Sequence, residues 1–94
     1  MANSVEIQLQ KAIEMKEKTQ EFSRILTRTM EELESMLEQF VRAGVPEDIA
    51  GTYYGGYYMP DRNIVDTLSN DIQTRHVDFL NRVIDDLKGA VDQK

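Results

Sequence analysis

One row of apolar residues, repeated at helical spacing through the first 40 residues, most constrains what this chain can fold into. From Met15 to Phe40 the steps are 4, 3, 4, 4, 3, 4 and 3 residues, which average about 3.6, the period of an α-helix. No proline or glycine interrupts the row, and Gly44 stands where a left-handed C-cap belongs, with Pro46 just beyond it. We therefore predict a helix over about residues 4–43. Its stripe consists of Val5, Leu9, Ala12, Met15, Thr19, Phe22, Leu26, Met30, Leu33, Leu37 and Phe40.

A second stripe with the same period follows after residue 61 and predicts a second helix over about residues 62–91. Either Asp61 or Asn63 can cap its N-terminus. The stripe consists of Val65, Leu68, Ile72, His76, Phe79, Val83, Leu87 and Ala90.

The segment between the stripes, residues 44–61, has a different composition and predicts a glycine- and tyrosine-rich connection. Pro46 and the two acids after it favour one short helical turn that Gly51 would end, and Gly55-Gly56 favours a turn between two tyrosine pairs. Tyrosine combines a rigid apolar ring with a polar tip, which suits interfaces. Two interpretations stay open: an exposed recognition patch, or rings that fold back and close the end of the core. The residues concerned are Tyr53, Tyr54, Tyr57 and Tyr58.

Together these elements predict an all-α fold, one domain over residues 1–94 in which two long antiparallel helices form a hairpin. Further apolar residues flank both stripes, so one facing helix cannot cover them. We therefore expect two hairpins to pair into a four-helix bundle, with a second copy or a related hairpin as the partner. The interface is expected to include Phe22, Leu26, Met30, Leu33, Leu37, Phe40, Leu68, Ile72, Phe79 and Val83.

Composition narrows the classes of partner. The net charge of −6, with no strongly basic stretch, argues against nucleic acid as a partner. No run approaches the roughly 18 apolar residues that a membrane span requires, and the N-terminus lacks the features of a cleavable signal peptide. We expect a protein that is cytoplasmic, or secreted without such a peptide.

The sequence offers little for catalysis. It has one histidine, no cysteine and no serine in a recognisable nucleophile motif, and no Lys-Ser/Thr pair follows Gly55-Gly56 as a phosphate-binding loop requires. We expect no enzyme activity, cofactor, metal or small-molecule substrate. The alternative is a metal-binding bundle in which Glu34, Glu38 and His76 meet across an interface, although Gln73 replaces the acid of a Glu-x-x-His pair.

The plan also resembles the WXG100 (ESAT-6-like) family, whose members are small, acidic, cysteine-poor helical hairpins. Tyr53-x-Gly55 and Tyr54-x-Gly56 are similar to the family's Trp-x-Gly turn, and Tyr57-x-x-x-Asp61 is similar to its Tyr-x-x-x-Asp/Glu export signal. The resemblance implies a dimeric four-helix bundle that is exported by type VII secretion without a cleavable signal peptide.

Overall fold

The chain is an all-α helical hairpin, and the computed structural model describes residues 4–92 of it. Within these residues there is no strand. The second helix is continuous but contains two π-helical turns, here named η1 and η2. The elements are α1 (Ser4–Arg42), α2 (Glu47–Tyr53), η1 (Tyr54–Tyr58), α3 (Met59–Asp71), η2 (Ile72–His76) and α4 (Val77–Asp92).

The turn after α1 confirms the C-cap that the sequence predicts. Gly44 has a φ of 105°, in the left-handed region that favours glycine. Its N–H donates to the Val41 carbonyl at 3.0 Å, and the N–H of Val45 donates to the Phe40 carbonyl at 3.3 Å. This pair of hydrogen bonds is the Schellman motif, which satisfies the last carbonyls of a helix and reverses the chain within a few residues.

The second helix begins at Glu47, so the predicted connection over 44–61 and the predicted helix start near residue 62 are wrong. The Pro46 carbonyl accepts the N–H groups of Ile49 and Ala50, both at 3.1 Å. Neither Gly51 nor the Gly55-Gly56 pair ends the helix. Each glycine costs about 1 kcal/mol relative to alanine in a helix. Burial of neighbouring apolar side chains offsets that cost.

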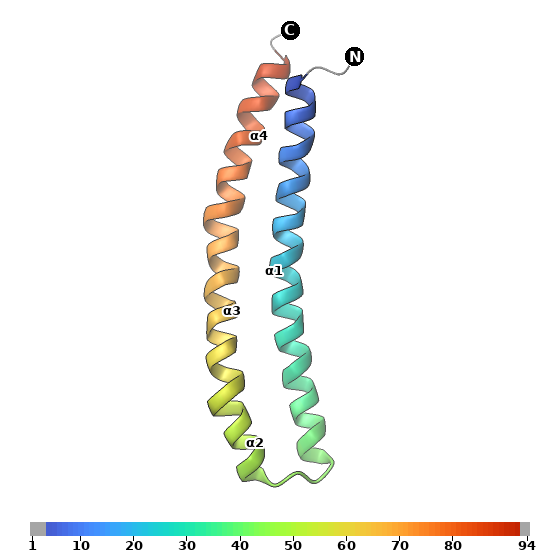
Figure 1. The fold of residues 1–94 in the computed structure, drawn as a ribbon, viewed down its shortest axis with the longest axis vertical. Coiled ribbons are helices and arrows are strands. Elements are labelled where there is room, and N and C mark those ends of the chain that lie inside the picture. Colours follow the sequence, from blue (N-terminus) through green and yellow to red (C-terminus); the bar gives the residue numbers. More distant parts are fainter. Residues whose placement is uncertain (1–3, 93–94) are drawn as a thin grey trace. The chain divides into compact units, whose positions relative to one another are not determined.

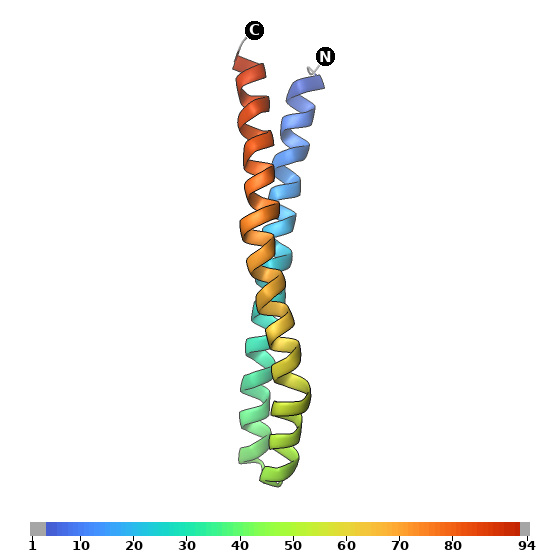
Figure 2. The ribbon, with the colours of Figure 1, turned by 90° about the vertical axis from the view of Figure 1, so that its left-hand side faces the viewer.

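The chain divides into two compact units, described separately below. Unit 1 comprises residues 1–23 and 70–94, and unit 2 comprises residues 24–69. Within each unit, a segment of α1 lies beside a segment of the second helix (Figures 1 and 2). Each unit also contains one of the two π-helical turns.

In unit 1, the buried row of α1 is narrower than the predicted stripe. Ala12 and Ser23 are buried, whereas Met15 and Phe22, both predicted members of the stripe, are exposed. Among the buried and half-buried side chains, one row takes alternating steps of four and three residues, the 3.5-residue period of two helices packed along each other. This row consists of Val5, Leu9, Ala12, Lys16, Thr19 and Ser23, and half-buried Ile13 and Gln20 flank it.

The turn η2 shifts the buried row of the second helix by one position. From Ile72 the row continues to Val77, a step of five residues, because a π-helical turn holds one residue more than an α-helical turn. Buried Val77 and Leu80 therefore replace His76 and Phe79, which an uninterrupted helix would bury, and Ile84 is buried beside half-buried Val83. The predicted places of His76 and Phe79 on the buried stripe are wrong, and both are exposed.

Unit 2 has a small core at the interface between α1 and the second helix. Met30, Ala50 and Tyr58 are buried, and Leu26, Leu33 and Leu37 are half-buried. The steps from Leu26 to Leu37 are 4, 3 and 4, so this part of α1 follows the predicted stripe.

We predict that deletion of Gln73 leaves unit 1 folded. Gln73 is exposed within η2, and losing it converts the π-helical turn to an α-helical one while Ile72 and Val77 keep their buried positions. Thermal unfolding followed by circular dichroism should show a cooperative transition with a midpoint close to that of the parent chain.

Deletion of Glu17, which is also exposed but lies in regular α1, is the matched control. It rotates the preceding residues by roughly 100°. Ser4, Gln8 and Lys11 then replace Val5, Leu9 and Ala12 in the buried row, and we expect a large loss of stability. Equal damage from both deletions would show that η2 is not a one-residue register shift.

Candidate interaction surface

The residues expected at an interface fall into three groups by exposure. Met30 and Ile72 are buried within their own units, so the chain itself already covers them. A half-buried group consists of Leu26, Leu33, Leu37 and Val83. The exposed group consists of Phe22, Phe40, Leu68 and Phe79.

The tyrosine segment is divided between the two interpretations that the sequence left open. The side chain of Tyr58 is only 2% exposed, whereas that of Tyr57 is 64% exposed. Tyr53 is half-buried and Tyr54 is exposed. The rings stack in pairs four residues apart, with centroid distances of 6.3 Å for Tyr53–Tyr57 and 5.5 Å for Tyr54–Tyr58. One face of the segment therefore closes the core and the other is offered to solvent.

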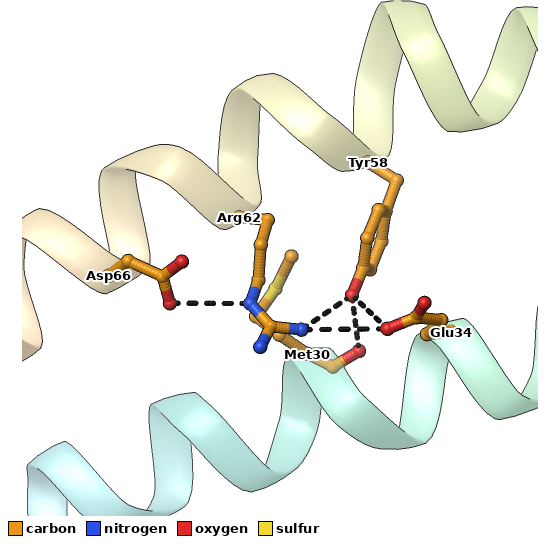
Figure 3. A network of polar contacts seen from close by, with 5 residues as sticks. All are labelled: Met30, Glu34, Tyr58, Arg62 and Asp66. Atoms are coloured by element: carbon orange, nitrogen blue, oxygen red, sulfur yellow. Dashed lines mark hydrogen bonds and ion pairs between the residues drawn. The ribbon is translucent and has the colours of Figure 1, made fainter.

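Tyr58 is the centre of a polar network that joins the second helix to α1 (Figure 3). Its hydroxyl oxygen lies 3.2 Å from the Met30 carbonyl and 3.1 Å from Glu34 Oε2, and its single hydrogen can be donated to one of them at a time. Arg62 Nη1 donates to the same oxygen at 2.8 Å and lies 3.7 Å from Glu34 Oε2. Arg62 Nε donates to Asp66 Oδ1 at 3.2 Å. The buried phenol is thus satisfied as both donor and acceptor.

Burial raises the pKa of Tyr58 above its ordinary value of 10.0, because removing the phenol from water disfavours the charged phenolate. The hydrogen bond to Glu34 adds to the increase, and the hydrogen bond from Arg62 opposes it. The network is therefore built for a neutral tyrosine.

An apolar surface lies beside this network. An open hollow of about 650 Å³ has no charged residue in its lining, which includes Leu33, Met36, Phe40 and Tyr53. A second hollow of about 410 Å³ shares Tyr53 and is also lined by Asp48, Ile49, Thr52 and Tyr57. We name six of the apolar residues that line these two hollows the turn-end patch: Leu33, Met36, Phe40, Ile49, Tyr53 and Tyr57.

A third hollow in unit 2 differs in its charge. Its volume is about 380 Å³, and Glu34, Glu38 and Arg42 line it together with Leu37, Val41 and Tyr54. Arg42 Nη2 lies 3.5 Å from Glu38 Oε2, so these charges are paired along α1. The contrast shows that the lack of charge in the lining of the first hollow is local to that surface.

Unit 1 has exposed apolar side chains of its own. Phe22 is 50% exposed and Phe79 is 61% exposed, and Met15 is exposed on α1. Phe79 is exposed as a consequence of η2, which gives its buried position to Leu80.

The candidate metal ligands have other partners. His76 is exposed, and its Nε2 lies 3.6 Å from Asp71 Oδ2, while Arg75 Nε lies 2.6 Å from Asp71 Oδ1. Glu34 takes part in the Tyr58 network. Over residues 4–92, no group of three or more histidine or acidic side chains is arranged to hold a metal ion.

The residues that carry the family resemblance lie within the second helix. Gly55 and Gly56 belong to η1, and the chain reverses at residues 43–46 instead. Tyr57 and Asp61 are one helical turn apart, in η1 and α3.

Searches of protein-family models, curated proteins and solved structures find no match for this chain. No helix in the described part of the chain is long and apolar enough to cross a membrane.

Sequence reasoning missed the role of Arg62. Its spacing from Tyr58 and Asp66, four residues on either side, is a signal for contacts along one helix. The contact with Glu34 also depends on how α1 and the second helix are aligned. The spacing of residues in the sequence gives no information about that alignment.

We predict that Tyr58→Phe lowers the free energy of unfolding by about 1 kcal/mol, because it removes the hydroxyl that links Met30, Glu34 and Arg62. Denaturant unfolding followed by circular dichroism measures the change. The matched control is Tyr57→Phe, at an exposed ring, which should change stability by less than about 0.5 kcal/mol. Equal effects would contradict a network centred on Tyr58.

Stability should fall at alkaline pH because of Tyr58. Below the unfolded pKa of 10.0, both states are protonated and the contribution of this group is complete. Above it, the unfolded state ionises while the folded state retains its proton until the higher folded pKa, so the free energy of unfolding decreases. Tyr58→Phe should remove this decrease, together with a tyrosinate absorbance step centred above pH 10. A removed step centred below that pH would contradict the assignment.

Proposed function

We propose that this protein is a non-catalytic interaction protein, a helical hairpin that associates with a second copy of itself into a four-helix bundle. The proposal rests on apolar side chains that the packing of two helices leaves uncovered.

The observation that carries the proposal is the imbalance between covered and uncovered apolar side chains. In the described part of the chain, eight apolar residues are buried and thirteen large apolar residues are exposed. Exposed apolar residues occur singly on most soluble proteins, whereas apolar residues that gather into contiguous patches are typical of surfaces that bind another protein. A second hairpin would bury many of these side chains at roughly 25 cal/mol per Å² of apolar surface.

Unit 1 is the part that suits a second copy. Its sequence contains nine acidic and seven basic residues, so two copies of it repel each other weakly. Phe22 and Phe79 are its largest exposed side chains, one on each helix, and aromatic residues are enriched in interfaces. We therefore assign self-association to Phe22 and Phe79.

The test is native mass by sedimentation equilibrium over a dilution series. We expect a mass close to twice the monomer mass of 10.9 kDa for the parent chain. The double variant Phe22→Ser/Phe79→Ser should shift the mass toward one chain while keeping its helical signal, because both side chains are exposed within the hairpin.

Ile25→Ser/Ile64→Ser, at two exposed apolar residues of unit 2, is the matched control and should keep the dimer mass. A parent chain that stays monomeric at every concentration would refute self-association. A dimer that only the control variant dissociates would place the interface in unit 2.

A further inference from the structure

The turn-end patch is open, and the larger of its two hollows has no charged residue in its lining. Its two hollows share Tyr53, and we name the two together the apolar track. The larger hollow is lined mainly by residues of α1, and the smaller one by residues of α2 and η1. Phe40 is 53% exposed, and Met36 and Tyr57 are also exposed. Methionine and tyrosine suit such a surface, because the flexible thioether adapts to different shapes and the tyrosine ring offers area at low entropic cost.

The sequence around the patch is strongly acidic. Residues 31–48, which supply much of its α1 side, contain six acidic residues and one basic residue, a net charge of −5. Glu32 lies one helical turn before Met36 on the same face of α1, and Asp48 lines the smaller hollow. Glu34, by contrast, is engaged with Arg62 and Tyr58. Uncompensated negative charge therefore borders the apolar track.

We propose that the turn-end patch is a docking site for a basic amphipathic helix of another protein. The apolar residues of that helix, spaced at i, i+3 or i+4 and i+7, occupy the two hollows, as in other helix-in-groove complexes. Its lysine and arginine side chains lie beside Glu32 and Asp48. This surface is separate from Phe22 and Phe79, so the proposal does not depend on self-association.

The negative charge around the patch favours a basic helix over a second copy of this chain as the partner. Two copies that met through the turn-end patch would bring two segments of net charge −5 together, and like charges across an interface disfavour association. A basic helix brings the opposite sign. It also explains why the apolar track is bordered by acids on α1 and α2.

The probe for the test is a labelled peptide of about 18 residues, roughly five helical turns, with leucine at the i, i+3, i+4 and i+7 positions and lysine elsewhere. Fluorescence anisotropy with the full chain should show saturable binding that weakens as ionic strength rises. The same peptide with glutamate in place of lysine should not bind. Equal binding of the two peptides would overturn the assignment of a basic partner.

Phe40→Ser and Ile64→Ser form a matched pair, because both remove a large exposed apolar side chain of unit 2 and neither should unfold the hairpin. Phe40→Ser should weaken peptide binding at least ~10-fold, the effect of losing a central anchor. Ile64→Ser should leave it within about 2-fold, as expected of a residue outside the interface. Equal weakening by both variants, or by neither, would refute the site.

Charge reversal gives a second test that leaves the apolar side chains intact. Glu32→Lys should weaken peptide binding and reduce its dependence on salt, whereas Glu17→Lys, at an exposed acid of unit 1, should do less. Sedimentation of the same variants separates this proposal from self-association. A dimer that Phe40→Ser converts to monomer would assign the patch to a second copy and overturn the basic partner.

Discussion

A helix with one neighbour can bury only a narrow row of its side chains, and this limit determines most features of the molecule. In unit 1 the row on α1 keeps a 3.5-residue period and includes the small residues Ala12 and Ser23, while Met15 and Phe22 stay outside it. The wider apolar band of the sequence therefore cannot be fully buried within the hairpin. The remaining large apolar side chains are exposed on the hairpin.

The π-helical turns change which residues form that surface. With an uninterrupted helix after Ile72, Phe79 would be covered and Leu80 exposed. The extra residue in η2 exchanges them, so an aromatic ring is presented to solvent and an aliphatic side chain fills the core. At η1 the tyrosine pairs four residues apart stack, Tyr58 is buried with its hydroxyl hydrogen-bonded to α1, and Tyr57 is exposed. At both π-helical turns, one face of the second helix is therefore buried and another face is exposed to solvent.

The sequence predicted the class of fold, the extent of α1 and the cap at Gly44, because each depends on local spacing and backbone chemistry. It did not predict that the second helix starts at Glu47, since three glycines favour a loop locally, whereas the burial of Ala50 and Tyr58 depends on tertiary packing. The π-helical turns carry no sequence signal of their own. For the candidate surface, the apolar period included Phe22, Phe40 and Phe79 among the interface residues. It placed them on the row that faces the other helix, whereas all three are exposed.

The Tyr58 network affects the neighbouring surface as well as stability. The carboxylate of Glu34 pairs with Arg62 and accepts a hydrogen bond from the Tyr58 hydroxyl. Its negative charge is therefore partly balanced by Arg62, and the carboxylate is held near the core. Glu32, two residues earlier on α1, points about 200° away around the helix and is not part of the network. These two acids of α1 therefore have different roles. Glu34 stabilises the hairpin, and Glu32 borders the turn-end patch, where it remains available to a basic partner.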